Sequence, residues 1–224
     1  MSNVKILSMK KPNFAKEKKL WKAGAKIVVG LDEAGRGCGA GPVVAAAVSI
    51  SPDFELKISG LRDSKKLSPR QRERIFNLAK KSKKIKWAIG KASPKEIDRL
   101  NILEATKLAM KRALKNLKSK IKEKTIDFLI LDGNFKLDLK IPQISVKKGD
   151  EKVFSCALAS IFAKVVRDKI MIDFSKKFPE YGFEKNKGYL TKFHLMALKK
   201  YGPCKIHRLS FFPIKILEEK KKIC

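Results

Sequence analysis

Three apolar, strand-like segments of this chain each end in an acidic residue beside a glycine. Asp32 and Glu33 close a run that begins at residue 27, Asp132 closes a run that begins at residue 126, and Asp150 follows the next short strand. Acidic residues normally avoid such positions, because an unpaired buried charge is costly. Two carboxylates about 4 Å apart repel by roughly 4 kcal/mol at an effective dielectric of 20. If these four carboxylates converge, they predict bound divalent cations.

The other metal-binding residue types are scarce. The chain has two histidines, His194 and His207, and four cysteines without a C-x-x-C pair. Carboxylate ligands favour Mg²⁺ or Mn²⁺ over zinc or copper. Such a site suits two-metal phosphoryl transfer, in which one ion activates a water and the other, about 3.5 to 4 Å away, stabilises the leaving oxygen. Each acidic residue alone could equally be a helix cap or a turn residue, but four together favour the metal site.

The elements that must position these carboxylates alternate between strands and helices. Ser68 and Ser93 begin capping-box sequences, with Gln71 and Glu96 three residues later. We predict strands at 27–31, 43–50, 85–89, 126–131 and 144–146. Two helices are predicted to start at 68 and at 93, and two further helices to span 101–117 and 153–174. This alternation predicts an α/β fold. Beyond residue 178 the pattern indicates helices and loops.

The chain is strongly basic. Lys and Arg number 53 against 22 acidic residues, which gives a formal net charge of +31. Such a surface attracts polyanions, nucleic acid above all; alternatively, a lysine-rich composition coats the whole protein without any specific role. The chain has no apolar run of about 18 residues and no N-terminal apolar segment, so we expect a reduced, cytoplasmic protein without a membrane span.

A series of short motifs carries a resemblance to a known family. They are LDEAGRG at 31–37, GPV at 41–43, DSKKLS at 63–68, NILEAT at 101–106, LDGN at 131–134, KGD at 148–150, ASIFAKVVRD at 159–168, YGF at 181–183, KGY at 187–189, GP at 202–203 and IHRLSF at 206–211. In this order they resemble bacterial-type ribonuclease HII over roughly residues 27 to 214. One such motif would be weak evidence, but the ordered series is specific.

The resemblance implies a ribonuclease H-like fold, a mixed five-stranded sheet flanked by helices, with a C-terminal helical extension. It implies three parts: a basic N-terminal arm over 1–24, mobile or loosely attached as a short helix, a catalytic domain over 25–178, and a helical and loop region over 179–224 that completes the substrate cleft. It also implies an endonuclease (EC 3.1.26.4) that needs Mg²⁺ or Mn²⁺ and works as a monomer on RNA/DNA hybrids and on DNA duplexes that contain ribonucleotides. The cut would lie 5′ of the ribonucleotide and leave 3′-hydroxyl and 5′-phosphate ends, which starts ribonucleotide excision repair.

Residue roles follow from the same resemblance. The metal-binding carboxylates of the family correspond to Asp32, Glu33, Asp132 and Asp150. The glycine-arginine-glycine turn, which senses the 2′-hydroxyl, corresponds to Gly35, Arg36 and Gly37; Tyr189 corresponds to the tyrosine that stacks on the sugar after the ribonucleotide. Glycines let backbone amides approach a sugar closely, and the 2′-hydroxyl is the group that distinguishes RNA from DNA. Expected phosphate contacts, any of which could instead be a solvated charge, are Lys65, Lys66, Lys148, Lys164, Arg167 and Arg208.

Three alternatives compete with this interpretation. Ribonuclease HIII shares the sheet but carries a substantial extra N-terminal domain, and only about 26 residues precede the first predicted strand. A basic nucleic-acid-binding protein with an inactive site would lack at least one metal carboxylate, and all four are present. A different two-metal nuclease of the same fold would not be expected to combine the turn at 35–37 with Tyr189. We assign no catalytic role to His194 or His207.

Overall fold

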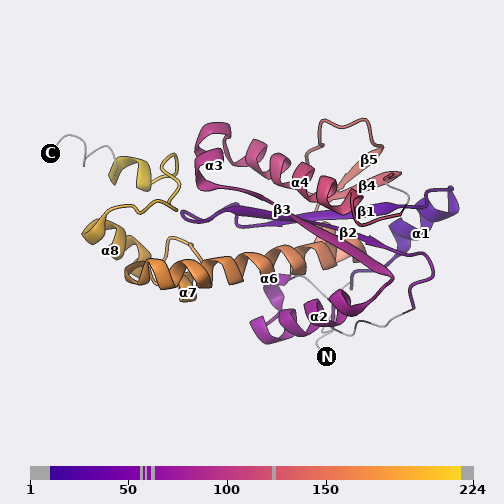
Figure 1. The fold of residues 1–224 in the computed structure, drawn as a ribbon, viewed down its shortest axis with the longest axis horizontal. Helices are drawn as coiled ribbons and strands as arrows, with labels where there is room; N and C mark the ends of the chain where they lie inside the picture. Colours follow the sequence, from indigo (N-terminus) through magenta and orange to yellow (C-terminus); the bar gives the residue numbers. More distant parts are fainter. Residues whose placement is uncertain (1–10, 56–57, 59, 62–63, 123–124, 218–224) are drawn as a thin grey trace, which may run out of the picture.

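The computed structural model describes residues 11–217, apart from 56–57, 59, 62–63 and 123–124. Its centre is a five-stranded sheet in the order β3-β2-β1-β4-β5 (Figure 1). The strands are β1 (Val28–Ala34), β2 (Val43–Ile50), β3 (Ile85–Ala92), β4 (Phe128–Asp132) and β5 (Gln143–Val146). Strands β1, β2 and β3 pair antiparallel, whereas β4 pairs parallel with both β1 and β5. The mixed sheet confirms the predicted fold class.

Helices cover both faces of this sheet, and further short helices follow α6 in the C-terminal part of the chain (Figure 1). Helix α4 packs on β2 and β3 on one face, and α6 packs on β1 and β2 on the other. The helical elements are α1 (Ala15–Lys22), η1 (Ser64–Lys66), α2 (Pro69–Lys81), α3 (Pro94–Leu100), α4 (Ile102–Lys118), α5 (Gly149–Lys152), α6 (Phe154–Lys177), η2 (Pro179–Tyr181), α7 (Phe183–Asn186) and α8 (Lys192–Tyr201). Helices α4 and α6 lie within three residues of the predicted bounds.

Burial on both faces explains why the central strands β1, β2 and β4 are almost continuously apolar, whereas the edge strand β3 mixes buried and more exposed residues. All eight residues of β2 are buried. Val43, Ala45 and Ala47 join the core under α4, while the alternate residues Ala46 and Val48 join the core under α6 and α2. Side chains of a strand point to opposite faces in turn, so a sheet covered on both faces leaves no polar side.

The predicted helix starts at Ser68 and Ser93 are confirmed. The Ser68 hydroxyl accepts the Gln71 backbone N–H at 3.2 Å, and the Gln71 side chain accepts the Ser68 N–H at 2.9 Å. Ser93 and Glu96 make the same reciprocal pair, and a proline occupies the first turn of each helix. Both capping boxes satisfy amide groups that an isolated helix end would leave unpaired.

The described part of the N-terminal segment differs from the loosely attached arm that we expected. The ring of Phe14 stacks on Phe154 with a centroid distance of 4.1 Å. Glu17 in α1 is fully buried, and its carboxylate accepts the Ser155 N–H at 2.8 Å. Helix α1 is therefore anchored on the start of α6, through the apolar contact of Phe14 and the hydrogen bond of Glu17. The lysine-rich composition of this segment had indicated a loose attachment instead. Residues 1–10 of the expected arm lie outside the described residues.

The region after α6 has a small core of its own. Met171 at the end of α6 packs with Tyr181, Phe183, Leu198 and Ile206. The domain boundary that we predicted after residue 178 falls between α6 and η2, and residues 218–224 lie outside the described part of the chain. Among the described helices, none combines the length and the apolar character needed to cross a bilayer.

Candidate active site

The sheet brings the predicted acidic residues together. β1 and β4 are parallel neighbours, with Leu31 paired to Leu131, so Asp32 and Asp132 follow at the same edge. Asp150 in α5 completes the group: carboxylate oxygens of Asp32, Asp132 and Asp150 all lie within 4.8 Å of one another. We refer to these three residues and Glu33 as the carboxylate cluster. The first three form an acidic site that can hold a metal ion.

A close turn positions Asp150. We expected it just past a strand, and it lies in the first turn of α5, where the Gly149 N–H donates to the Asp132 carboxylate at 2.8 Å. A side chain at residue 149 would place its Cβ 3.2 Å from the Asp132 Cα, so glycine permits this approach. The preceding Lys148 has a left-handed backbone with φ of 56°, which directs the chain into the turn.

Repulsion and burial make the cluster costly without a cation. Asp32 is only 6% exposed, and burial raises the pKa of its carboxyl well above its usual range, with further increases from the charges of Glu33 and Asp132. The Ser160 hydroxyl and the Glu33 backbone N–H donate to Asp32 and partly offset these effects. A divalent ion among these oxygens would remove the repulsion and restore the charged form of Asp32.

One carboxylate oxygen of Glu33 lacks a hydrogen-bond partner among the described residues. The Oε1 of Glu33 accepts from Arg36 at 3.4 Å, but the Oε2 is buried and has no donor in the described part of the chain. Burial raises the pKa of Glu33, while the Arg36 guanidinium lowers it and Asp132 raises it again. A buried carboxylate oxygen without a donor is costly. The orphaned oxygen and the clustered carboxylates fit a hard divalent cation, which takes oxygen ligands.

The cluster lines a pocket of about 260 Å³ together with most of the predicted recognition residues. These are Gly35, Arg36, Gly37, Lys65, Lys164 and Tyr189. Ser64 and Ser160, which we did not single out, line it too, and their hydroxyl oxygens lie 2.8 Å apart. Both serines lie within the family motifs at 63–68 and 159–168, which was the available signal. Asp63 of the first motif lies outside the described residues.

Arg167 and Arg208 occupy positions that differ from the phosphate contacts we expected. Both are buried, at 1% and 0% exposure. Arg167 donates from its three guanidinium nitrogens to the carbonyls of Pro42, Ala40 and Lys187, at 2.8 to 3.0 Å. Since the group lies below the surface and each of its nitrogens donates to a backbone carbonyl, Arg167 does not reach a phosphate.

Arg208 repeats this arrangement from the other end of the chain. Its guanidinium donates to the carbonyls of Gly41, Arg36 and Gly35 at 3.0, 2.9 and 2.6 Å. Burial lowers the pKa of Arg208 to about 10, so the group remains charged at neutral pH. We call residues 35–42 the arginine-held loop, because Arg167 and Arg208 together donate to five of its carbonyls.

Gly35 shows why this loop begins with glycine. Its φ of +98° is unfavourable for residues with a side chain, and a Cβ there would lie 2.0 Å from the Arg167 Nε. The Gly35 and Arg36 carbonyls point to the buried Arg208. The N–H groups of the same two peptide units, those of Arg36 and Gly37, therefore point the other way and have no backbone acceptor inside the described part of the chain. The Arg36 side chain is 41% exposed. The loop therefore presents donors at the wall of the pocket.

Two of the predicted lysines lie outside the lining of the pocket. The Lys66 Nζ is 3.1 Å from one Glu151 carboxylate oxygen, and the Lys148 Nζ is 4.0 Å from the other. Lys164 lines the pocket, but its ammonium pairs with Asp168 at 2.8 Å and lies 6.0 Å from the centre of the Tyr189 ring. The lysines thus surround the site at different depths.

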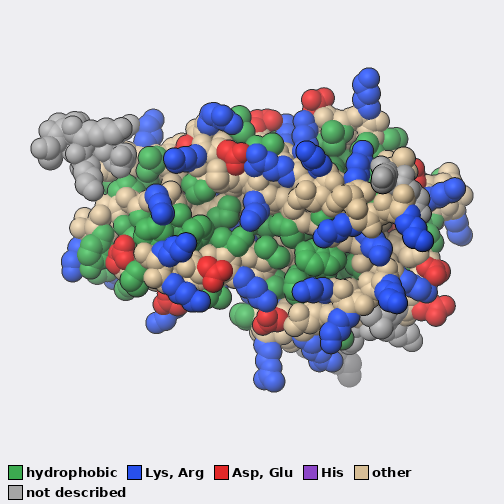
Figure 2. Space-filling view, viewed as in Figure 1, with side chains coloured by type: hydrophobic (Ala, Val, Ile, Leu, Met, Phe, Trp, Pro, Cys, Tyr) green, Lys and Arg blue, Asp and Glu red, His purple; other side chains and the backbone are tan. Residues whose placement is uncertain are grey.

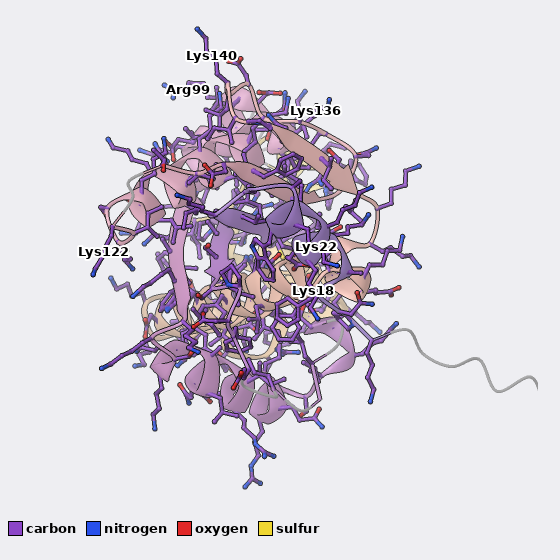
Figure 3. The ribbon with its side chains drawn as sticks, turned by 90° about the vertical axis from the view of Figure 1, so that its right-hand side faces the viewer. Lys18, Lys22, Arg99, Lys122, Lys136 and Lys140 are labelled. Atoms are coloured by element: carbon purple, nitrogen blue, oxygen red, sulfur yellow. The ribbon has the colours of Figure 1, made fainter. Side chains whose placement is uncertain are left out.

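Positive charge is not confined to this pocket. Lysine and arginine side chains are scattered over the whole face in Figure 2. In the end-on view, Lys122 and Lys140 lie at the edge of the molecule on different sides, and Lys18 and Lys22 lie over its middle (Figure 3). The excess charge therefore acts as a general attraction for polyanions, and the local geometry of the pocket must supply selectivity.

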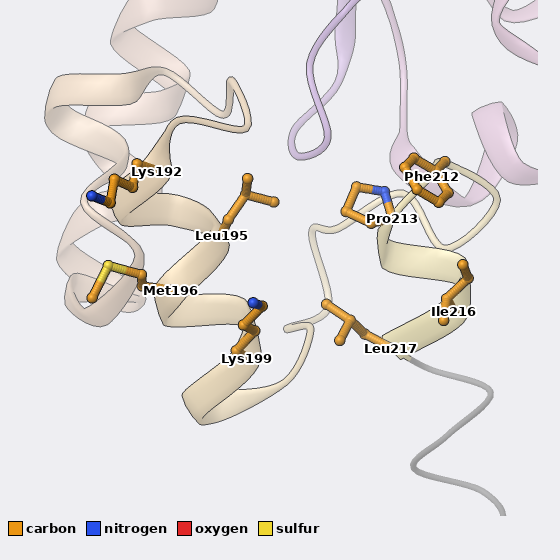
Figure 4. Close-up of a pocket in the computed structure, with 8 residues that line it drawn as sticks. All are labelled: Lys192, Leu195, Met196, Lys199, Phe212, Pro213, Ile216 and Leu217. Carbon is orange, nitrogen blue, oxygen red and sulfur yellow. The ribbon is translucent and has the colours of Figure 1, made fainter.

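A second cavity has a different character. It lies between α8 and residues 212–217 and has a volume of about 530 Å³ (Figure 4). Its lining is Leu195, Met196, Phe212, Pro213, Ile216 and Leu217, with Lys192 and Lys199 at its border. It contains no acidic residue, so it offers no metal ligands.

Comparison with known proteins identifies the family. The family model for ribonuclease HII matches residues 29–213, which include the carboxylate cluster and the arginine-held loop. The chain belongs to the ribonuclease HII family. A ribonuclease HII from Desulfitobacterium hafniense is 50% identical over 198 residues, which cover 88% of this chain and 73% of that protein. As a ribonuclease HII, the chain is a metal-binding endoribonuclease that acts on RNA/DNA hybrids.

Solved structures agree with this assignment. The ribonuclease H2 from Pyrococcus horikoshii superposes with a TM-score of 0.67 at 28% identity, covering 88% of this chain and 99% of that one. Bst-RNase HIII, solved in complex with Mn²⁺, gives a TM-score of 0.68 at 20% identity, covering 89% of this chain and 71% of that one. The second likeness shows the shared fold alone, and the higher sequence identity to ribonuclease HII separates the two families.

Proposed function

We propose that this ribonuclease HII cuts on the 5′ side of a ribonucleotide embedded in duplex DNA, by two-metal hydrolysis that leaves 3′-hydroxyl and 5′-phosphate ends. The observation that carries the proposal is the carboxylate cluster, with three carboxylates within 4.8 Å and the orphaned Oε2 of Glu33 beside them. Asp32, Glu33, Asp132 and Asp150 would hold two Mg²⁺ or Mn²⁺ ions. Bound divalent ions supply an activated water and neutralise the leaving oxygen.

The residues of the chain itself orient the substrate. The N–H groups of Arg36 and Gly37 face the pocket because the carbonyls of the loop are held from below, and they offer donors to the 2′-hydroxyl. Tyr189 is 46% exposed at the same pocket and presents its ring to the sugar after the ribonucleotide. Lys65 and Lys164 neutralise adjacent phosphates, and Lys66 and Lys148 act farther out.

We further propose that the enzyme works as a monomer in the cytoplasm, where it starts the excision of ribonucleotides from DNA. The described cysteines Cys38, Cys156 and Cys204 are free thiols, as a reducing compartment favours. One chain supplies all the residues that the proposed reaction uses at this pocket.

Mapping the cut tests the proposal. A DNA duplex with one ribonucleotide is incubated with the enzyme, with and without Mg²⁺ or Mn²⁺, and the product ends are identified by mass spectrometry. We expect metal-dependent cleavage 5′ of the ribonucleotide and a free 3′-hydroxyl. The same duplex with a deoxyribonucleotide at that position should remain intact. Cleavage on the 3′ side, or a cyclic phosphate end, would contradict the proposed chemistry.

A further inference from the structure

The two histidines of the chain lie against each other inside the small core of the C-terminal region. His194 comes from α8 and His207 from the segment that follows it, and their exposures are 0% and 2%. Their Nε2 atoms are 2.9 Å apart. Two ring nitrogens at this distance share one hydrogen, because two protonated nitrogens would repel and two unprotonated nitrogens would leave both lone pairs unpaired. In the hydrogen bond between the two rings, one Nε2 therefore donates and the other accepts.

The outer nitrogens decide which ring donates. The Nδ1 of His194 is 2.9 Å from the carbonyl oxygen of Tyr189, an acceptor, so it must carry the hydrogen. The Nε2 of His194 is then unprotonated and accepts from His207. The Nδ1 of His207 is left as an acceptor, and the backbone N–H of Cys204 donates to it at 2.9 Å. Every polar atom in this chain of bonds has a partner.

The opposite pair of tautomers is unfavourable at both outer nitrogens. It would place an unprotonated His194 Nδ1 against the Tyr189 carbonyl and a protonated His207 Nδ1 against the Cys204 N–H. The one gain would be a bond from the His207 Nδ1 to the Cys204 carbonyl at 3.2 Å. Two repulsive contacts in a buried site outweigh one long hydrogen bond.

The pair connects both walls of the recognition pocket. At one end it holds the carbonyl of Tyr189. At the other end, His207 precedes Arg208, whose side chain fixes the arginine-held loop and whose N–H donates to the Gly39 carbonyl at 2.9 Å. The Gly41 N–H donates to the Ile206 carbonyl at 2.8 Å. A shift in either histidine would therefore move Tyr189 relative to the loop.

The surroundings keep both rings neutral. Burial lowers the pKa of His194, and burial together with the His194 ring lowers the pKa of His207 to about 4. The rings of Tyr181 and Phe183 pack against the pair, with 4.8 Å between the centres of the Tyr181 and His207 rings. Among the described residues, the titratable side chain whose ring packs on both histidines is Tyr181, and the neighbouring Cys204 touches His207 through its backbone. Burial raises the pKa of both the phenol and the thiol, so both are neutral at physiological pH.

We propose that His194 and His207 are positioning residues: a neutral bridge with one fixed tautomer at each ring, which sets the backbone of Tyr189 relative to the arginine-held loop. This role rests on the function proposed above for Tyr189. It gives the histidines a part in ribonucleotide selection without any contact with the substrate.

Nuclear magnetic resonance tests the bridge directly, because a protein without an affinity tag has only these two imidazole rings. Long-range ¹H–¹⁵N spectra of ¹⁵N-labelled full-length protein should show His194 protonated at Nδ1 and His207 protonated at Nε2. His207 should remain neutral between pH 8 and about pH 5, and His194 should titrate below the range of an exposed histidine. Identical tautomers, or a ring that titrates near pH 6.5 as exposed histidine does, would overturn the proposal.

A matched pair of variants tests the consequence for selection. His194→Phe keeps a ring but removes both bonds, whereas His194→Asn places an amide donor where Nδ1 meets the Tyr189 carbonyl. We expect His194→Phe to lower kcat/KM for a duplex with one ribonucleotide by about tenfold, with a smaller loss on a long RNA/DNA hybrid. His194→Asn should recover most of the loss. Equal losses on both substrates, or no recovery, would show a merely structural role.

Two controls separate this inference from the proposed function. Mn²⁺ affinity, measured by calorimetry, should be unchanged in both His194 variants, since neither residue contacts the carboxylate cluster. Tyr189→Ala is measured in the same cleavage assay. If Tyr189→Ala keeps wild-type selectivity, the proposed role of Tyr189 fails; if Tyr189→Ala loses selectivity and His194→Phe does not, the bridge fails as a positioning device.

Discussion

The carboxylate cluster and the arginine-held loop both bury charge, but they compensate for it differently. In the cluster, Asp32 is pushed toward its neutral form and the Oε2 of Glu33 has no donor among the described residues. In the loop, two buried arginines satisfy all their nitrogens with backbone carbonyls. Buried charge alone therefore does not indicate where a ligand binds. What distinguishes the cluster is that its unpartnered Glu33 oxygen lies beside three further carboxylates, whereas Glu17, which also has a buried oxygen without a partner among the described residues, is not part of such a cluster.

The largest expected effect comes from removing one charge of the cluster. Asp132→Asn keeps the oxygen that accepts the Gly149 N–H but weakens metal binding. Cleavage should fall by about a thousandfold or more, because metal stabilisation of the transition state contributes several kcal/mol. The metal-free protein should not lose stability, since a repelling charge has gone.

Single-turnover cleavage and thermal unfolding with and without Mn²⁺ measure both effects. The control is Asp138→Asn, because Asp138 is an exposed aspartate that pairs only loosely with Lys111 at 3.7 Å. Substrate binding should survive in both variants. Full activity of Asp132→Asn would remove this residue from the mechanism and end the contrast between the two regions.

The arginine-held loop should respond in the opposite way. Arg208→Lys keeps the charge but cannot donate to three carbonyls in a planar fork. We expect the free energy of unfolding to fall by about 3 kcal/mol, because buried carbonyls lose their donors. Arg36→Lys, on the exposed side of the same loop, should change it by less than about 0.5 kcal/mol. Urea unfolding measures both, and equal losses would show that burial does not distinguish these arginines.

A smaller effect is expected from pH, because Asp32 in the cluster and His207 contribute to stability with opposite dependence on pH. The raised pKa of Asp32 means that its ionisation costs stability as pH rises, so the cluster is relieved in acid. His207 has the opposite sign. The unfolded chain takes up a proton below about pH 6.5 that the folded protein refuses until about pH 4, so stability is lost as pH falls through this window.

Between pH 7.5 and 5.0 this difference in His207 should remove about 2 kcal/mol of stability. Urea unfolding at both pH values, compared with His207→Asn, isolates it because the other groups are common to the two proteins. The variant should lose less stability over this interval than the wild type. An identical loss in both proteins would show that His207 is not buried in its neutral form.

Part of this molecule could be predicted from sequence for a clear reason. Strands β1 and β4 are apolar until they reach Asp32 and Asp132, so the central sheet and the edge that holds these two residues follow from patterning alone. The capping boxes at Ser68 and Ser93 follow from local spacing, which needs no tertiary information. Asp150 was recognised by its motif, although its place in the first turn of α5 was not expected.

The remaining features depend on contacts that no local pattern encodes. The sequence does not reveal whether an arginine faces phosphate or carbonyl oxygens, so Arg167 and Arg208 were interpreted as phosphate contacts. Their carbonyl partners lie more than 120 residues away, except for the Lys187 carbonyl. Likewise, the burial of Glu17 depends on the Ser155 N–H, 138 positions along the chain.

The distance in sequence between Arg208 and the loop that it holds has a consequence for synthesis. Arg208 lies 173 residues after the Gly35 carbonyl that it binds. The four acidic residues of the cluster are all synthesised by residue 150, whereas Arg208 comes 58 residues later. The loop at 35–42 can therefore take its final form only after the ribosome has passed Arg208, although the loop itself is among the first parts of the sheet domain to be made.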